Sequence, residues 1–361
     1  MGAIDAGCDF FAGYPITPAT PILLRMTSEL PRSGGIAIQA EDEISAMGFC
    51  IGAALTGART MTATSGPGIS LFSEHIGMAI MVEVPLVIVD CQRLGPSTGG
   101  ATTGAQGDIQ FLRWGHSGGY PVIVLSPTNV SDCYNLTLRA FDLAERFRIP
   151  VFLATEKDTV LNRISVDTTE FDCPVVRSRN FAPDDADYAP YRFDRLSDVP
   201  AMASFGGPHL VRLTSSSHDE GGYLIKDAPN MARINQHLNA KILESVDEIS
   251  HVHLDLQVGA ETLIISYGIT GASAAEAVVF ARSQGERVSA LTVYSLWPVP
   301  EKEIRGALVG VNKIVVPEMN IGLYLREIRR LASDDQEVIG VNRVDGGLIE
   351  PVEILKRGGI R

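Results

Sequence analysis

The sequence is poor in basic residues and has no long hydrophobic run. Its 361 residues include 30 Lys and Arg against 43 Asp and Glu, which gives a formal net charge of −13. Nucleic acid is not an expected partner, because phosphate binding depends on clustered Lys and Arg. Glu, Asp or Gly breaks every apolar run before the roughly 18 residues that a membrane span needs. No Lys or Arg opens the chain as in a signal peptide, so we expect a cytoplasmic protein without a membrane span.

Cysteine is also scarce, and no C-x-x-C motif occurs. The five cysteines are Cys8, Cys50, Cys91, Cys133 and Cys173. Their spacing excludes an iron–sulfur cluster or a structural zinc held by a local Cys motif, and we expect no metal site in this chain. An odd number of cysteines, several of them in apolar runs, indicates buried thiols in a reducing compartment.

Strand-like and helix-like segments alternate over the first 155 residues. Strands are predicted at 36–39, 59–64, 85–90, 121–125 and 150–155, and helices at 46–55, 69–81 and 129–146. The run Pro85–Asp90 is apolar throughout, which is typical of a strand buried on both faces. The alternation therefore favours an α/β fold with a parallel sheet covered on both sides.

The pattern weakens from about Thr159 to Asp255, and a second α/β unit begins at Glu261. Pro, Asp, Arg and Tyr are frequent between 180 and 200, which indicates a long irregular excursion. The second unit has predicted strands at 262–267, 288–294 and 313–316 and helices at 272–285, 301–309 and 323–331. We therefore predict two domains, residues 1–245, with the irregular excursion at 159–245, and residues 246–361.

An acidic cluster at 39–43 precedes the predicted helix at 46–55. No Lys or Arg occurs from Ser33 to Ala58. Carboxylates are common at helix N-termini because they interact favourably with the helix dipole, so this cluster alone can be purely structural. After Glu43 follow an Ala- and Gly-rich helix, a Thr-Gly turn, a strand and the turn Ser65-Gly66-Pro67-Gly68.

This order resembles the pyrimidine-binding domain of thiamine-diphosphate enzymes. The resemblance implies that Glu43 hydrogen-bonds the aminopyrimidine, while Glu41 is the alternative that the sequence leaves open. It also implies cofactor contacts from Ser65, Gly66, Pro67 and Gly68, where glycines let the backbone approach a ligand closely. By itself such a string is more often an ordinary turn.

The string Gly13-Tyr14-Pro15-Ile16-Thr17-Pro18 is the most specific in the chain. Its two prolines restrict the backbone and favour an extended conformation at Thr17, although a rigid structural loop would have the same restriction. It resembles the substrate loop of 2-oxoacid:ferredoxin oxidoreductases. The resemblance implies that Tyr14, Pro15, Ile16 and Thr17 line the substrate site and that Thr17 contacts the oxoacid.

Arg93 follows the apolar strand Pro85–Asp90, at the kind of position where open α/β sheets bind ligands. A guanidinium can hold a carboxylate through two parallel hydrogen bonds, but a surface arginine explains the position equally well. The family resemblance implies that Arg93 binds the oxoacid carboxylate and that Ser97 and Thr98 line its pocket. The strings at 95–100 and 104–108 resemble the family's 2-oxoglutarate-type members.

Four weaker candidates remain. His218-Asp219-Glu220 resembles a loop of the family's α subunits and has no assigned role. His251 and His253 would share one face of a strand, where a polar strand edge is the more ordinary interpretation than a metal site. Gly268–Gly271 lacks the third glycine of a dinucleotide-binding fingerprint and resembles a transketolase C-terminal domain, and Glu318-Met319-Asn320 resembles the family's second domain.

The usual thiamine-diphosphate metal motif, Gly-Asp-Gly followed by Asn-Asn, is absent from the sequence. The resemblance therefore implies a β subunit that supplies the diphosphate site, Mg²⁺ and a [4Fe-4S] cluster. It implies an assembly of α2β2 or larger, with possible γ and δ subunits. Ferredoxin would be the electron acceptor and coenzyme A a co-substrate. The first seven residues begin partway into a helix that usually precedes the Tyr-Pro-Ile-Thr-Pro string.

The resemblance therefore implies the α subunit of a 2-oxoacid:ferredoxin oxidoreductase. The expected fold is a pyrimidine-type thiamine-diphosphate domain followed by a transketolase C-terminal-like α/β domain. The preferred substrate is 2-oxoglutarate, which would yield succinyl-CoA and carbon dioxide, while pyruvate and other 2-oxoacids stay open. The alternatives are a subunit of a non-oxidative thiamine-dependent decarboxylase and a catalytically silent scaffold subunit.

Overall fold

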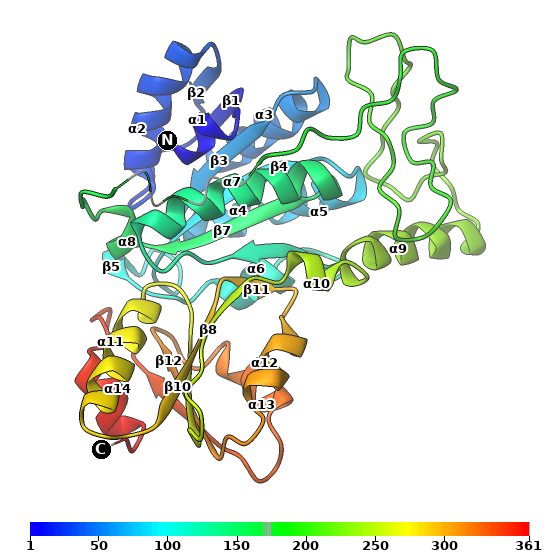
Figure 1. Ribbon diagram of the computed structural model, residues 1–361. Helices are drawn as coiled ribbons and strands as arrows, with labels where there is room; N and C mark the ends of the chain where they lie inside the picture. The colour runs from blue at the N-terminus through cyan, green and yellow to red at the C-terminus, as the bar shows by residue number, and fades with distance from the viewer. Residues whose placement is uncertain (168, 170, 172–174, 361) are drawn as a thin grey trace.

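The computed structural model describes residues 1–167, 169, 171 and 175–360, and these form two sheets with their covering helices (Figure 1). The elements of the first part of the chain are α1 (Gly2–Asp5), β1 (Phe10–Gly13), α2 (Thr20–Glu29), the 3₁₀ helix η1 (Leu30–Ser33), β2 (Ile36–Gln39), α3 (Glu43–Leu55), β3 (Thr60–Thr64), α4 (Gly66–Leu71), α5 (Ser73–Met81), β4 (Leu86–Leu94), β5 (Gly100–Gly104), α6 (Ile109–Trp114), β6 (Ile123–Leu125), α7 (Val130–Phe147), β7 (Pro150–Glu156) and α8 (Lys157–Val160).

The later elements are α9 (Ala228–Leu243), α10 (Val246–Ile249), β8 (Val252–Asp255), β9 (Thr262–Ser266), α11 (Thr270–Ser283), β10 (Val288–Val293), β11 (Ser295–Trp297), α12 (Glu301–Ala307), β12 (Lys313–Glu318), α13 (Leu325–Leu331), β13 (Glu337–Asn342) and α14 (Pro351–Arg357).

The first sheet has the strand order β11-β6-β7-β4-β3-β1-β2, with β5 attached to β4. Strands β6, β7, β4, β3, β1 and β2 are parallel to one another, whereas β11 and β5 pair in the antiparallel sense. The central strand β4 is buried from Leu86 to Arg93, and α7 packs against both β7 and β4. The predicted parallel sheet with covered faces is confirmed, and its continuous apolar strands follow from burial on both sides.

The second sheet has the order β13-β12-β9-β10-β8, in which only β8 pairs in the antiparallel sense. After β10 the chain turns at Tyr294 and leaves this sheet. The next strand, β11, pairs antiparallel with β6 at the edge of the first sheet. The two α/β units, drawn one above the other in Figure 1, are thus joined by a strand as well as by covalent linkage.

Two predicted elements differ from the structure. The expected helix at 69–81 is two helices, α4 and α5, which share the buried residue Phe72 as their common cap. The irregular excursion was wrong in part, because it contains the 16-residue helix α9. Ile234, Leu238 and Ile242 of α9 are buried at helical spacing. Periodicity alone missed this helix because polar residues share its buried face.

The buried face of α9 carries an ionic cluster. Lys241 Nζ lies 2.6 Å from Glu83 Oε2, and His237 Nε2 lies 3.2 Å from the same oxygen. All three side chains are almost completely buried. Burial alone would raise the pKa of Glu83, but Lys241 and His237 together hold it well below the usual range of a glutamate. This cluster fastens α9 to the turn between α5 and β4.

Cys8, Cys50 and Cys91 are buried free thiols, as predicted, and Cys133 is a half-buried one. Burial raises the pKa of Cys50 to about 12, so its thiol is protonated at neutral pH. Cys173 lies outside the described residues. In the part of the chain that the structure describes, no helix is long and apolar enough to cross a bilayer.

Candidate active site

The predicted site residues gather at one edge of the first sheet. Neighbouring strands β2, β1, β3 and β4 end there, because they are parallel. Glu43 follows β2, Thr17 follows β1, and Arg93 lies near the end of β4. The turn at 65–68 follows β3 directly. The carboxyl edge of a parallel sheet is where α/β proteins bind ligands, so residues far apart in the sequence meet at the edge of the sheet that favours binding.

Glu43 is the first residue of α3 and is buried. The exposed Asp42 caps the helix by accepting a hydrogen bond from the Ser45 N–H at 2.7 Å. Glu43 is therefore not needed as the cap, and its side chain lies instead against the turn at 65–68. An ideal Cβ on Gly68 would lie 2.8 Å from Glu43 Cγ and 3.1 Å from its Oε1. The alternative residue, Glu41, is exposed, so burial favours Glu43.

Several polar atoms beside this turn are buried and lack hydrogen-bond partners among the described residues. They include Thr64 Oγ1 and Ser65 Oγ. Buried hydroxyls are normally paired, so unpaired ones beside a buried carboxyl fit a bound polar ligand or water. Pro67 lies in the first turn of α4, where its missing N–H costs no helical hydrogen bond.

Arg93 and Thr17 lie side by side. Arg93 Nη1 donates a 2.7 Å hydrogen bond to the Thr17 backbone oxygen. The arginine is 6% exposed, and its Nε is buried without a partner among the described residues. Thr17 itself is exposed. One guanidinium edge thus orients the Thr17 loop, while a second N–H group has hydrogen-bonding capacity left for a ligand.

The other predicted substrate residues lie in exposed loops. Tyr14 is 37% exposed, and Pro15 is exposed and Ile16 half-buried beside it. Ser97 and Thr98 lie in the exposed turn between β4 and β5, which places them a few residues after Arg93. Their positions fit the mouth of a pocket, and their roles stay predictions.

The sequence interpretation gave no role to three acids with buried carboxyl oxygens at this edge, namely Asp90, Asp108 and Glu156, although Asp108 closes the string 104–108 that resembles the family. Asp90 lies on β4 with both carboxyl oxygens buried and unpaired among the described residues. Glu156 ends β7 and accepts a 2.7 Å hydrogen bond from Gln106 Nε2. Asp90 closes the apolar run Pro85–Asp90. An acid at the end of a run that predicts a buried strand is the sequence feature that could have indicated this residue.

The motif Glu318-Met319-Asn320 joins the two units. Asn320 Nδ2 donates to the Gln106 backbone oxygen at 2.7 Å, and the Met319 N–H donates to Gln106 Oε1 at 3.0 Å. Gln106 Nε2 also donates to the Tyr267 oxygen beside Gly268. The strings at 268–271 and 318–320 therefore contribute to the contact between units.

His218-Asp219-Glu220 has a structural role. His218 is buried, packs against Tyr191 with the two rings tilted and 3.8 Å between their centroids, and contacts the Met81 backbone oxygen through Nε2 at 3.1 Å. Asp219 Oδ1 accepts backbone hydrogen bonds from Gly221 and Tyr223. The loop thereby attaches the excursion to the end of α5.

His251 precedes β8 and His253 lies within it. His251 stacks on Tyr294. Within the described ranges, no three His, Cys, Asp or Glu side chains come together as a metal-binding group.

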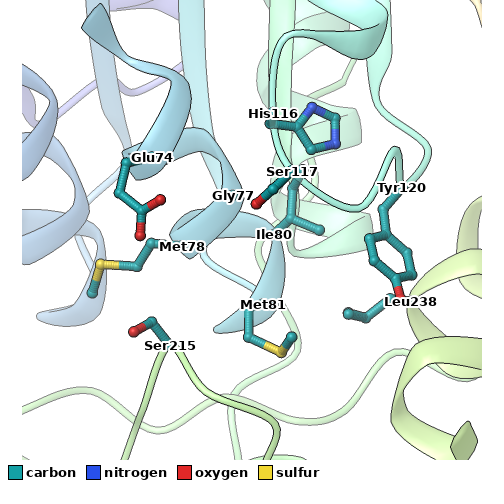
Figure 2. A pocket seen from close by; sticks show the side chains of 10 residues that line it. All are labelled: Glu74, Gly77, Met78, Ile80, Met81, His116, Ser117, Tyr120, Ser215 and Leu238. Atoms are coloured by element: carbon teal, nitrogen blue, oxygen red, sulfur yellow. The ribbon is translucent and has the colours of Figure 1, made fainter.

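Two cavities lie elsewhere on the first unit. The smaller, of about 120 Å³, has walls from α5, from the loop at 116–120 and from α9; Figure 2 shows Met78 and Met81 opposite His116 and Tyr120. Burial and the charge of Arg113 lower the pKa of His116. The larger, of about 750 Å³, lies over Met61, Val89 and Leu153.

Comparison with known proteins identifies the family. Residues 1–235 match the family model described as "Pyruvate flavodoxin/ferredoxin oxidoreductase, thiamine diP-bdg", and residues 260–354 match "Pyruvate:ferredoxin oxidoreductase core domain II". This chain belongs to the pyruvate flavodoxin/ferredoxin oxidoreductase family. The expectation of a 2-oxoacid:ferredoxin oxidoreductase subunit is confirmed at this level.

Relatives within the oxidoreductase family are similar over nearly the whole chain. The 2-oxoglutarate synthase subunit KorA of Methanothermobacter thermautotrophicus is 43% identical, with 98% of this chain and 94% of the relative covered. The KorA subunit of Methanocaldococcus jannaschii is 39% identical, with the same two shares covered. A ketoisovalerate oxidoreductase subunit VorB of Methanothermobacter thermautotrophicus is 34% identical over 99% of this chain and 94% of its own.

Solved structures agree with the family assignment. A 2-oxoglutarate:ferredoxin oxidoreductase from Magnetococcus marinus, with 2-oxoglutarate, coenzyme A and succinyl-CoA bound, has a TM-score of 0.89 at 31% identity. The match covers 99% of this chain and 62% of that one. A split-gene transketolase, in an inactive tetramer, has a TM-score of 0.57 at 13% identity over 99% of this chain and 95% of its own, a likeness of fold alone. The predicted fold class, a thiamine-diphosphate-type domain followed by a transketolase-like α/β domain, is confirmed.

Proposed function

We propose that this chain is the α subunit of a heteromeric 2-oxoglutarate:ferredoxin oxidoreductase. The complex would convert 2-oxoglutarate, coenzyme A and oxidised ferredoxin into succinyl-CoA, carbon dioxide and reduced ferredoxin. The observation that carries the proposal is the meeting of Glu43, the turn at 65–68, Thr17 and Arg93 at one sheet edge. The family assignment and the similarity to proteins named 2-oxoglutarate synthase support the choice of substrate.

The residues at this edge fit an aminopyrimidine ring. Glu43 offers a buried carboxyl oxygen, and the unpaired Ser65 and Thr64 hydroxyls lie at the adjacent turn. Gly68 has no room for a Cβ, because the turn lies directly against Glu43. Glu43, Ser65 and the turn backbone would therefore hold the pyrimidine. Thiamine diphosphate, when bound, supplies a nucleophilic carbon and an electron sink for decarboxylation.

Arg93 and Thr17 would hold the oxoacid. A substrate carboxylate can accept hydrogen bonds from the free guanidinium N–H groups of Arg93, and the Thr17 hydroxyl can donate a hydrogen bond to another oxygen of the substrate. The low exposure of Arg93 strengthens such a contact, because little water competes for the charge. The two residues would align the 2-oxo carbon with the cofactor, which is a positioning role. Tyr14, Pro15, Ile16, Ser97 and Thr98 would line the entrance.

The partner subunit would supply what this sequence lacks. We propose that a β subunit carries the diphosphate site, Mg²⁺ and a [4Fe-4S] cluster, and that α2β2 or a larger assembly is the active form. Isolated, this chain is expected to bind thiamine diphosphate poorly and to show no turnover.

The proposal is tested by reconstituting the complex with Glu43→Gln and Glu41→Gln. Removing the buried carboxylate should lower 2-oxoglutarate-dependent dye reduction by about 10²–10⁴-fold, the usual range for a group that moves a proton. Glu41→Gln is the matched control and should keep near wild-type activity, because Glu41 is exposed. Full turnover by Glu43→Gln would refute the assignment and favour a scaffold subunit.

Measuring carbon dioxide release and dye reduction together addresses the reaction class. Release of carbon dioxide without any dye reduction would identify a non-oxidative decarboxylase instead. Comparing rates on 2-oxoglutarate, pyruvate and 2-oxoisovalerate names the acid, and a preference for 2-oxoisovalerate would match the VorB relatives rather than the KorA ones.

A further inference from the structure

Asp108 lies where a helix cap would be expected, but it does not act as one. It precedes α6, and its side chain makes no capping hydrogen bond. Its carboxyl group instead lies against the turn at 65–68, since an ideal Cβ on Gly66 would be 2.9 Å from Asp108 Oδ2. Its backbone N–H donates to Gln92 Oε1 at 3.1 Å. Asp108 is thus held between the cofactor turn and the end of β4.

The surroundings of Asp108 are polar, buried and largely unpaired. Asp108 Oδ2, both Asp90 oxygens, Gln92 Nε2 and Arg93 Nε have no partner among the described residues. Asp90 and Gln92 are two residues apart on β4 and therefore lie on the same face of the strand. Asp90 is also the register partner of Thr64 on β3. Such a group of unpaired atoms has no packing explanation, because buried polar groups are normally satisfied.

The charges around Asp108 oppose one another. Burial raises the pKa of Asp108 to about 6, and the positive charge of Arg93 acts in the opposite direction. Burial raises the pKa of Asp90 well above its usual value, and the charges of Asp108 and Glu156 add to that effect. Burial raises the pKa of Glu156 to about 7, whereas the hydrogen bond from Gln106 lowers it. Arg93 is therefore the positive charge that helps to keep Asp108 ionised.

We infer that Asp108 is a positioning residue whose protonation is coupled to substrate binding. It is ionised and interacts with the charge of Arg93 in the free protein, and it takes up a proton when an anionic substrate binds. In the free protein, Asp108 carries a negative charge and Arg93 a positive charge in the same site. A substrate carboxylate on Arg93 would neutralise that arginine and add a negative charge beside Asp108. The acid pair Asp108 and Asp90 would then take up a proton from solvent, and the proton belongs to the pair rather than to one residue. The inference rests on the proposed role of Arg93.

The sign of the pH dependence follows by linkage. Substrate binding raises the proton affinity of Asp108, so protonation must in turn favour substrate binding. Affinity for the oxoacid should be constant below the free-state pKa of about 6. Above it, the dissociation constant should rise by up to about tenfold per pH unit, until the pH passes the raised pKa of the bound state. An acid whose pKa is the same in the free and bound states would give no such window.

The test is calorimetric titration of the assembled complex with N-oxalylglycine, an unreactive analogue of 2-oxoglutarate. Titrations in buffers of different ionisation enthalpy at pH 7 measure the protons taken up on binding. The wild-type complex should take up a fraction of a proton, and Asp108→Asn should take up less, because only Asp90 of the pair remains. The variant should also bind more tightly than wild type at pH 8, an effect that loss of structural support would not produce.

Asp158→Asn is the matched control. Asp158 lies against Gly104, the strand partner of Arg93, but Lys157 already neutralises it at 2.8 Å. The proton uptake of the Asp158→Asn complex on binding the analogue should equal that of the wild type. The inference is overturned if the wild type takes up no proton between pH 6 and pH 8, a result that needs no variant. It is equally overturned if Asp108→Asn takes up as much as the wild type. Arg93→Ala separates the two proposals, because unchanged binding by that variant would remove Arg93 from the oxoacid site, on which this inference rests, and would leave the reaction class to the Glu43→Gln test.

Discussion

Replacing Gly68 by alanine is the sharpest test of how Glu43 is positioned. The added Cβ would overlap Thr64 Oγ1 and would lie 2.8 Å from Glu43 Cγ, whereas ordinary contacts begin at 3.4 Å. To restore an ordinary contact, the distance between the new Cβ and Glu43 Cγ must grow by roughly 0.6 Å, so Glu43 or the turn itself has to shift. Overpacking of this kind costs about 1–3 kcal/mol of folding free energy. A catalytic group displaced by this order of distance loses up to about 10²-fold in rate.

The assay separates the two effects. Stability is measured on the full chain by urea unfolding, and turnover by 2-oxoglutarate-dependent dye reduction in the complex. Gly52→Ala is the control for stability, since Gly52 lies on the same helix and an added Cβ would meet nothing within 4 Å. That substitution should stabilise α3 by about 0.5–1 kcal/mol. If Gly68→Ala folds normally and keeps full turnover, the contact between the turn and Glu43 does not set the geometry of the site.

Two further predictions concern the anchoring of the fold. Lys241→Met should cost about 3–5 kcal/mol by leaving Glu83 buried without its main cation, and adding Glu83→Gln should restore part of it, as urea titrations would measure. Because the folded-state pKa of Glu83 is lowered, ionised Glu83 stabilises the fold at neutral pH, and this contribution is lost as the pH falls through and below the unfolded value of about 4.3. A Lys241→Met variant that loses as much unfolding free energy at pH 3 as at pH 7 would contradict this. Gln106→Leu removes hydrogen bonds to Glu156, Tyr267 and Met319, so scanning calorimetry should resolve separate transitions for the two units, and one unchanged transition would disprove the contact's importance.

The positions of the candidate site residues in the fold could be predicted where a local rule applied, while their roles came from the family resemblance. Arg93 follows the uninterrupted apolar run Pro85–Asp90, which predicts a strand buried on both faces. The carboxyl end of such a strand is a binding position. Glu43 begins a helix with no nearby cation, and its spacing to the turn at 65–68 is fixed by one helix and one strand. In these cases local sequence determines local geometry.

Other features depend on distances that no local pattern encodes. Lys241 and His237 look like solvent-facing residues of α9 until Glu83, more than 150 residues earlier, is placed beside them. The sequence shows Asp108 only as the end of the string 104–108, and its contact with the turn at Gly66 and the charge of Arg93 become visible only in the fold. The motif at 318–320 matched the family, but its contact with Gln106 required the docking of two sheets.

Strand β11 bears on how such a protein can be divided or recombined. The second unit covers the edge of the first sheet with Ser295–Trp297, and the Trp297 indole N–H donates to the Ile109 oxygen at 3.1 Å. An open strand edge is a template for pairing with other chains. Exchange of the second unit between relatives must therefore preserve this short strand and its register with β6, so the two units are constrained to diverge together.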